Sequence, residues 1–535
     1  MSFVRDAPAP FNNPRADVVL RTCDGVDYRV RSSILAEASP VFGDIFDLAS
    51  EAPSEALSEW PPRKDGIPIV SITETSEVAD ILLRFCYPVA APTFTTFSQV
   101  QDVLTAVDKY LMEGLIEVVK KHLTDISLDG AHPLRLYATA YAHRFEDVAR
   151  IAAKETIGKP LQTVYVTELE SLSAGAYYWL LEFHKTGKAD VIPEVPFLSV
   201  DPSRTSARPP PGPHSRTAWI SKYASPYPFG LPFADFTLRT CDGIALRVHS
   251  DLLRVASPYF RLMLADTSQS IEGIEKDSDG RIIGLVVPEH SNTIATVLQY
   301  VYPVERPDSL PDPQTASLLL YAAKKYDVVP ALAPLQAMFL AFAAEHSLVI
   351  YAIACARYWV HEARHAALAS MRMPLDDLCY VDELEAIPAS CLYRLTQHRN
   401  TLGNMARRMV LSQAQEFLKQ LTQPSSQGVC KYYAWVYCME CRADTAVTLC
   451  RAGTKSSGLR KWWCDWLRRI AELLREVPSG QTVLDEQAIV CAVKDARDCP
   501  ICRVDADTEL RRYAKELSIK VDAMLVHEMS RITFF

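Results

Sequence analysis

Glycine is scarce in this chain, with 19 residues among 535. Loops that cradle phosphate groups rely on glycine, because their backbone must approach the ligand closely. The patterns G-x-x-x-x-G-K-[ST], G-x-S-x-G and G-x-G-x-x-G are all absent, which argues against nucleotide-binding loops and nucleophile elbows. The chain is therefore expected to lack enzymatic signatures and not to be an enzyme.

Long apolar runs and a basic surplus are also missing. No stretch approaches 18 uncharged apolar residues, and the apolar run Ala337–Ala344 is far too short to cross a bilayer. The first residues lack the apolar core of a signal peptide. The net charge of -9 argues against a nucleic-acid partner. Fourteen cysteines without a secretory signal are expected to be reduced thiols. We expect a cytoplasmic or nuclear protein with no membrane or nucleic-acid partner.

What the chain does contain is an internal repeat. Residues 16–42 read ADVVLRTCDGVDYRVRSSILAEASPVF, and residues 234–260 read ADFTLRTCDGIALRVHSDLLRVASPYF. The two stretches align without gaps and are identical at more than half of their positions, which indicates two copies of one structural unit. Each copy is predicted to form a strand, a tight turn at Asp-Gly, a second strand and a helix, because Asp and Gly tolerate the positive φ of a hairpin turn.

The repeated residues resemble the BTB/POZ family, whose pattern is D-V-x-L, a glycine, a strand, H-x-x-x-L and A-x-S-x-x-F. The matching positions are Asp17, Gly25, Leu35, Ser39 and Phe42 in the first copy and Asp235, Gly243, His249, Leu253, Ser257 and Phe260 in the second. Arg31 replaces the family's His in the first copy, and in both copies Ala stands directly before the Ser. The resemblance implies a protein-interaction fold without an active site, in which these residues are structural and the Asp is partly buried.

The repeat extends beyond these stretches. Leu136–Ala142 pairs with Ile350–Ala356, and Tyr165–Glu170 pairs with Tyr380–Glu385, so each unit is expected to carry a helical extension. A stretch centred on Pro209–Pro213 is predicted to be a spacer, with an SH3-type ligand as the alternative. The predicted fold class is α+β. Its parts are a disordered tail (1–14), BTB-like domains (15–125 and 232–340), helical extensions (126–188 and 341–400), a linker (189–231) and an all-α cysteine-rich C-terminal module (401–535).

Two C-x-x-C pairs lie in the C-terminal module: Cys438 with Cys441, and Cys499 with Cys502. Each C-x-x-C turn presents two thiolates to one ion, so the four cysteines together are a candidate structural zinc site. The two pairs lie much farther apart than in a zinc ribbon. Packing of buried cysteines is therefore the favoured interpretation, and structural zinc and a redox dithiol are the alternatives. No other cofactor is expected.

Three further residue types have a chemical and a structural interpretation. The tryptophans Trp462, Trp463 and Trp466 fall at helical spacing, which favours a packed core over stacking on nucleic-acid bases. The carboxylates Asp17 and Asp235 have no His or nucleophile at a recognisable spacing, so a structural role is favoured over a catalytic base. For His249 a hydrogen-bonded position at a helix start is favoured over a metal ligand.

The resemblance implies a non-enzymatic scaffold or adaptor that binds other proteins. The commonest function in that family is to recruit substrates to a cullin-based ubiquitin ligase, through the helical side of the domain. The corresponding residues here are Leu48–Glu51, Tyr110–Leu115 and Tyr326–Val329. The family's hydrophobic-x-Glu cullin motif is not clearly present in either copy. The alternative function is that of a BTB-type nuclear transcription cofactor.

Many BTB proteins, by the same resemblance, dimerise through a helix and strand placed before the D-V-x-L strand. Here Pro8, Pro10 and Pro14 interrupt any helix before Ala16, and the stretch before Ala234 is equally rich in proline. Pairing of the two copies within one chain is the remaining option, and the linker is long enough to permit it. A monomer is predicted, in which the two BTB-like domains pack against each other or against each other's helical extensions.

Overall fold

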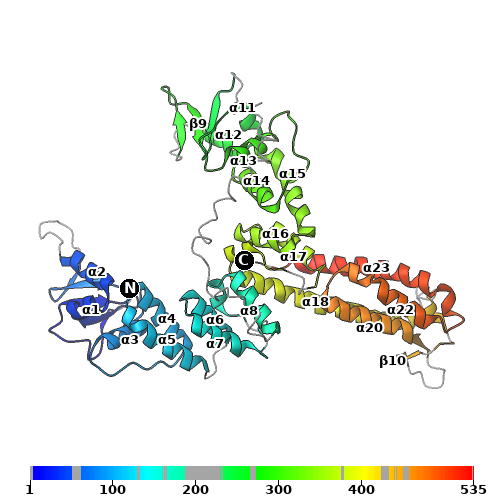
Figure 1. The fold of residues 1–535 in the computed structure, drawn as a ribbon, viewed down its shortest axis with the longest axis horizontal. Helices are drawn as coiled ribbons and strands as arrows, with labels where there is room; N and C mark the ends of the chain where they lie inside the picture. Colours follow the sequence, from blue (N-terminus) through cyan, green and yellow to red (C-terminus); the bar gives the residue numbers. More distant parts are fainter. Residues whose placement is uncertain are drawn as a thin grey trace. The chain divides into compact units, whose positions relative to one another are not determined.

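The computed structural model is helix-rich, with small sheets in both repeats (Figure 1). The chain divides into two compact units. Unit 1 comprises residues 1–172 and 180–199, and unit 2 comprises residues 173–179 and 200–535. The structure describes residues 4–50, 62–128, 133–159, 161, 165–186, 229, 233–265, 273–374, 379–422, 433–438, 440–441, 443–449, 457–532 and 534.

Unit 1 begins with a mixed sheet of strand order β1-β3-β2-β5-β4. Val18 lies opposite Val30 in the antiparallel hairpin of β2 and β3, and the second residue of the Asp-Gly turn, Gly25, has the expected positive φ of 79°. Strand β5 is parallel to β2 and antiparallel to β4. The strands are β1 (Arg5–Asp6), β2 (Val18–Arg21), β3 (Val26–Val30), β4 (Arg63–Lys64) and β5 (Ile67–Ser71).

Within residues 4–14, Arg5–Asp6 form a strand of this sheet and Asn12 forms an isolated bridge to Arg29, which corrects the predicted disordered tail. Strand β1 is parallel to β3. The side chain of Phe11 is 1% exposed and its ring lies against those of Tyr28 and Tyr87. Burial of this aromatic side chain holds the segment in place although its prolines exclude a helix.

Helices pack on the sheet and continue into the first extension. The amphipathic faces of α3 and α4 are buried, and Thr96 with Gln99 forms a capping box that fixes the start of α4. The helices are α1 (Ser32–Ala38), α2 (Pro40–Ser50), α3 (Ser76–Cys86), α4 (Phe97–Lys109), α5 (Glu113–Leu128), α6 (Pro133–Ala142), α7 (Glu146–Thr156), the 3-10 helix η1 (Thr167–Glu170) and α8 (Ala174–Thr186).

Unit 2 opens with a sheet of strand order β7-β6-β9-β8. Phe236 lies opposite Val248 in the antiparallel hairpin of β6 and β7, and Gly243 at its turn has φ 80°. Strand β9 is parallel to β6 and antiparallel to β8. These strands thus follow the order and directions of β3, β2, β5 and β4. Their bounds are β6 (Phe236–Arg239), β7 (Ala245–Val248), β8 (Ile274–Lys276) and β9 (Ile282–Val286).

The helices of the second repeat follow in the same order as those of the first. They are α11 (Ser250–Ala256), α12 (Pro258–Ala265), α13 (Ser291–Leu298), α14 (Pro313–Lys325), α15 (Val329–Ala341), η3 (Phe342–Ala344), α16 (Ser347–Ala356), α17 (Val360–Ser370) and η5 (Asp382–Ala386). Residues 173–179, at the start of α8, pack on this part of unit 2. Ser173 forms an isolated antiparallel bridge to Pro388, and its hydroxyl donates to Glu385 at 2.6 Å.

The C-terminal module contains long helices that run side by side (Figure 1). Helix α18 (Ala389–Thr422) is continuous across residue 400, where a boundary was predicted, so the second extension and the module share one helix. The other helices are α19 (Ala434–Tyr437), α20 (Lys461–Glu476), α21 (Gly480–Val483), α22 (Glu486–Ala496) and α23 (Cys502–Ser530).

The expectation of an all-α C-terminal module is wrong. Strands β10 (Ala443–Leu449) and β11 (Ser457–Arg460) form a two-stranded antiparallel sheet. The β-branched residues of the segment ADTAVTL favour an extended chain, and it lacks the apolar periodicity of a helix.

Several sequence predictions fall outside the described residues. These are residues 189–228 and 230–231 of the predicted linker, including Pro209–Pro213, and Glu51 at the predicted partner surface. Phe229 is buried and its ring lies against that of Tyr302. Among the helices that the structure describes, none combines the length and the apolar character needed to cross a membrane.

Candidate functional sites

The predicted signature carboxylates stabilise helix starts. Asp17 accepts hydrogen bonds from the backbone N–H of Ser32 at 2.7 Å and from its hydroxyl at 2.8 Å. Asp235 accepts the same two bonds from Ser250, at 2.8 and 2.5 Å. A carboxylate at this place accepts a hydrogen bond from an N–H group that has no partner within the helix. Its negative charge also interacts favourably with the positive end of the helix dipole. Both residues are exposed, unlike the partly buried carboxylate that the resemblance implies.

The signature serines are buried and connect distant helices. The hydroxyl of Ser39 donates to the carbonyl of Tyr110 at 2.5 Å and accepts from the N–H of Phe42 at 3.1 Å. Ser257 bonds in the same way to Tyr326 and Phe260, at 2.6 and 3.0 Å. In each copy the signature Phe ring also stacks on that Tyr ring. These residues therefore have a packing role.

His249 is hydrogen-bonded at the start of α11. The hydroxyl of Tyr302 lies 3.0 Å from its Nδ1 and accepts from its backbone N–H at 2.8 Å. The N–H of Arg31, at the same position of the first copy, donates to the hydroxyl of Tyr87 at 2.7 Å. The remaining signature leucines, Leu35 on α1 and Leu253 on α11, are buried in the hydrophobic core.

One pair of structural residues was missed by the sequence analysis. Asp24 and Asp242 were interpreted as turn residues, but each also caps a helix. Asp24 accepts from the N–H and hydroxyl of Ser76, and Asp242 accepts from those of Ser291. The serines lie far along the chain from the carboxylates, so no local spacing indicates the pairing.

Asp242 also lies beside Cys241 and His290, and these three side chains could reach one metal ion. The carboxylate is already engaged by Ser291 and by the hydroxyl of Thr240 at 2.5 Å, and all three candidate ligands are exposed. In the first copy Asp24 bonds in the same way to Ser76 and Thr22, although Thr75 stands there in place of His290. The carboxylate therefore makes these hydrogen bonds with or without the histidine, and its structural role accounts for the cluster.

The expectation that enzymatic signatures are absent is wrong for one pattern. His361-Glu362-Ala363-Arg364-His365 on α17 is an H-E-x-x-H sequence, which in metalloproteases supplies two zinc ligands and a general base. The carboxylate of Glu362 is buried and accepts from Lys324 at 2.6 Å and from Gln336 at 2.8 Å. Burial raises its pKa, but these two donors bring that pKa below the ordinary value. We assign a structural role to Glu362, since its carboxylate is engaged in this ion pair.

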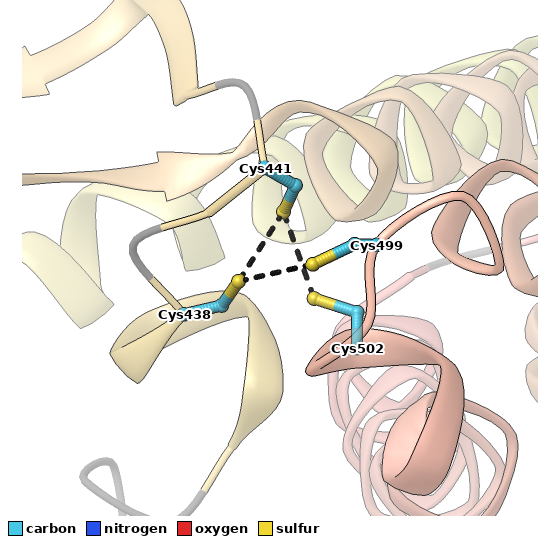
Figure 2. Close-up of side chains that lie close together, drawn as sticks. All are labelled: Cys438, Cys441, Cys499 and Cys502. Carbon is cyan, nitrogen blue, oxygen red and sulfur yellow. Dashed lines mark hydrogen bonds between the residues drawn. The ribbon is translucent and has the colours of Figure 1, made fainter.

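The four cysteines of the two C-x-x-C pairs come together in unit 2 (Figure 2). The sulfur of Cys438 lies 3.6 Å from that of Cys441 and 3.4 Å from that of Cys499. The sulfurs of Cys441 and Cys502 are 3.6 Å apart, and all four lie within 4.8 Å of one another. Figure 2 shows the four side chains pointing toward a common centre. We call this group the four-cysteine cluster.

Two separate parts of the module supply the four-cysteine cluster. Cys438 ends α19 and Cys441 precedes β10, whereas Cys499 follows α22 and Cys502 begins α23. Helix α19 is held to α23 by a hydrogen bond from the N–H of Ala434 to Glu509 at 2.6 Å. Arg460 donates to the carbonyl of Cys441 at 2.7 Å. The cluster therefore joins segments separated by residues 442–498.

The thiols of the four-cysteine cluster have unequal acidity. Burial raises the pKa of Cys441 to about 12 and also raises the pKa of Cys502. Burial acts in the same direction on Cys499, but backbone N–H groups of Cys502 and Ile501 and the neighbouring thiols lower its pKa to about 7. Hydrogen bonds to a sulfur favour its thiolate form.

The three predicted tryptophans lie in the core beside the four-cysteine cluster. Trp462, Trp463 and Trp466 are buried on α20, and the ring of Trp463 stacks on that of Trp435 with centroids 5.3 Å apart. Base stacking on nucleic acid needs exposed rings, so the predicted core role is the correct one.

The predicted partner surface is exposed in part. Its exposed apolar side chains are Leu48, Leu111 and Val329, whereas Tyr110 and Tyr326 are buried.

The first copy as a whole is a small mixed sheet covered by helices, and its matched polar residues hold those helices in place. Such a domain belongs to the class of small α+β domains in which helices cover a mixed sheet.

Comparison with known families defines this class further. Residues 11–127 match the model of the BTB/POZ domain family, so this part of the chain is a BTB/POZ domain. Domains of this family mediate binding between proteins and are generally not enzymes. No curated protein matches the chain.

Proposed function

We propose that the chain is a scaffold that binds different proteins through two BTB-like domains, the BTB/POZ domain at 11–127 and a second at 232–340. The second assignment is supported by its strand order and by the contacts of Asp235, Ser257 and Tyr302. Each of these contacts has an equivalent in the first copy.

The observation that carries this proposal is a difference between the exposed surfaces of the two copies, whose interiors are alike. The second copy exposes Val255 and Leu262, at 86% and 67% of their surface. The same alignment places Glu37 and Asp44 at these positions of the first copy, and both are exposed. An exposed apolar side chain favours an apolar partner surface, whereas a carboxylate disfavours it. The two copies are therefore suited to different partners.

The finer proposal is that the scaffold is an adaptor for a cullin-based ubiquitin ligase. It rests on the family's commonest function and on the exposure of Leu48 and Leu111 at the corresponding helical side of the first copy. These two side chains present apolar surface that a partner can cover.

Affinity purification of the full chain from cells, with quantitative mass spectrometry, tests both levels of the proposal. Leu48→Asp with Leu111→Asp should remove one set of partners, and Val255→Glu with Leu262→Glu should remove a different set. Val504→Glu with Ile519→Glu is the matched control, because these exposed apolar residues lie on α23. The control should retain every partner.

Loss of the same partners in both test variants, or of none, would contradict the assignment of two partner surfaces. The presence of a cullin among the purified partners tests the ligase-adaptor proposal separately. We expect a cullin among the partners of the unmodified chain and its loss with the Leu48 and Leu111 substitutions. Its absence from the unmodified chain would reject the ligase adaptor, and nuclear transcription factors in its place would favour the cofactor alternative.

A further inference from the structure

We propose that the four-cysteine cluster binds one Zn²⁺ ion as a structural site. This inference is independent of the proposed scaffold function, because it concerns the folding of the C-terminal module and none of its argument involves the BTB-like domains.

The first argument is the spacing of the sulfurs. Four thiolates at about 2.3 Å from one tetrahedral ion lie about 3.8 Å from each other. Three sulfur pairs of the cluster are separated by 3.4, 3.6 and 3.6 Å, and all pairs by at most 4.8 Å. A single ion at the common centre in Figure 2 therefore reaches all four sulfurs with small adjustments.

The second argument is the chemistry of the donors. Four cysteines without a carboxylate or imidazole form a soft ligand set, which selects Zn²⁺ over Mg²⁺ or Ca²⁺. Cys438, Cys499 and Cys502 are buried and Cys441 is partly exposed, which is typical of a closed structural site. The Arg460 side chain bound to the carbonyl of Cys441 places a positive charge near the thiolates.

Packing alone explains this arrangement less well. Cysteines that fill a core need no contact with one another, yet here each of the four sulfurs lies within 3.6 Å of another one. A disulfide requires about 2.0 Å between two sulfurs, and Cys438 and Cys441 each have two neighbours at similar distances. That equivalence is expected when one centre orders all four thiols.

The fold indicates what such an ion does. It links the end of α19 and the start of β10 to the turn between α22 and α23, and so closes the loop formed by residues 442–498. Strands β10 and β11 and helices α20 to α22 lie within this loop. Binding of the ion therefore favours the folded module over the unfolded chain.

Metal analysis of the full chain, purified without added zinc, is the direct test. We expect one zinc per chain by elemental mass spectrometry. Replacement by Co²⁺ should give the intense d–d absorption of tetrahedral thiolate ligation. A metal-free chain with reduced thiols, a chain with two disulfides, or bound iron in place of zinc would each overturn the proposal.

Variants locate the ion in the chain. Cys499→Ser with Cys502→Ser should reduce the bound zinc to near zero. Cys464→Ala with Cys491→Ala is the matched control: it removes two cysteines of the same module outside the cluster and should retain one zinc. Zinc retained by the first variant or lost by the control would contradict the assigned ligands.

A ligand variant that fails to fold is covered by a test on the unmodified chain. Treatment with a strong zinc chelator should lower the melting temperature of unit 2, and added Zn²⁺ but not Mg²⁺ should restore it. An unchanged melting temperature after complete removal of zinc would reject the structural role.

Discussion

At the scale of single residues, the two copies of the repeat share several polar contacts in their interior, and a buried charge in the sheet is one of their differences. In the first copy, the carboxylate of Asp27 has no exposed surface and bonds to Arg21 at 2.8 Å and to Lys64 at 2.6 Å. Ala245 takes its position in the second copy, where Arg239 pairs with Glu275 instead. A buried carboxylate is stable because it has two cationic partners.

Asp27→Asn is expected to destabilise unit 1 by about 1–3 kcal/mol at pH 7, since Arg21 and Lys64 then lose their common partner. The estimate is at the lower end for buried pairs because both cations are partly exposed. Chemical unfolding, with hydrogen exchange to assign the change to β2 and β3, measures it. The control Glu275→Gln, in a more exposed pair, should cost at most about 1 kcal/mol.

The pH dependence of this contribution follows from the pKa of Asp27. Burial raises that pKa, but hydrogen bonds and charges of Arg21 and Lys64 lower it below the ordinary value. The carboxylate therefore contributes its full stabilisation above about pH 4, the pKa of an unfolded Asp. The contribution is lost as the pH falls further, so the unmodified chain and Asp27→Asn should become more similar in stability. A constant difference down to pH 2 would contradict this assignment.

At the scale of elements, the close approach of α18 and α20 depends on one glycine. A Cβ atom at Gly403 would lie 2.9 Å from the backbone oxygen of Arg475 and 3.1 Å from that of Leu474. Backbone atoms cannot move away as a flexible side chain can, so a larger residue would force the two helices apart.

Gly403→Ala is therefore expected to destabilise unit 2 by about 1–3 kcal/mol, although alanine is the better helix former. Gly114 on α5 is the matched control, because a Cβ atom there has no neighbour within 4 Å. Gly114→Ala should leave stability unchanged or raise it by up to about 1 kcal/mol. Thermal unfolding compares the two, and a stabilising Gly403→Ala would show that the helices adjust to the added methyl group.

At the scale of the whole molecule, we predict a monomer with a mass near 59.8 kDa. Strand β1 is already paired with β3 of its own chain, so it is not available to a second copy. The tether between the repeats also raises their effective concentration for each other. Sedimentation at micromolar concentration measures the mass, and a value twice as large would contradict the prediction. Loss of such a dimer in Val255→Glu with Leu262→Glu would identify that surface as its interface.

Local signals in the sequence were enough to predict much of each repeat. Both Asp-Gly hairpins depend on neighbouring residues, because the turn sets the register and the alternating side chains set the buried face. The structural role predicted for Asp17 and Asp235 also involves residues of the same hairpin and its following helix, since each carboxylate binds the N–H of a serine 15 positions later. The repeat itself made these signals clear, because the same residues occur twice.

Tertiary structure decided the features that depend on distant segments. Phe11 is buried because Tyr28 and Tyr87 provide its pocket, and nothing within the proline-rich segment indicates that pocket. Glu362 is engaged by Lys324 on another helix, so its sequence pattern alone misrepresents its role. The two C-x-x-C pairs looked too far apart for a common site. They meet because α19 packs against α23, and helix packing is set by complementary side chains that no short sequence pattern contains.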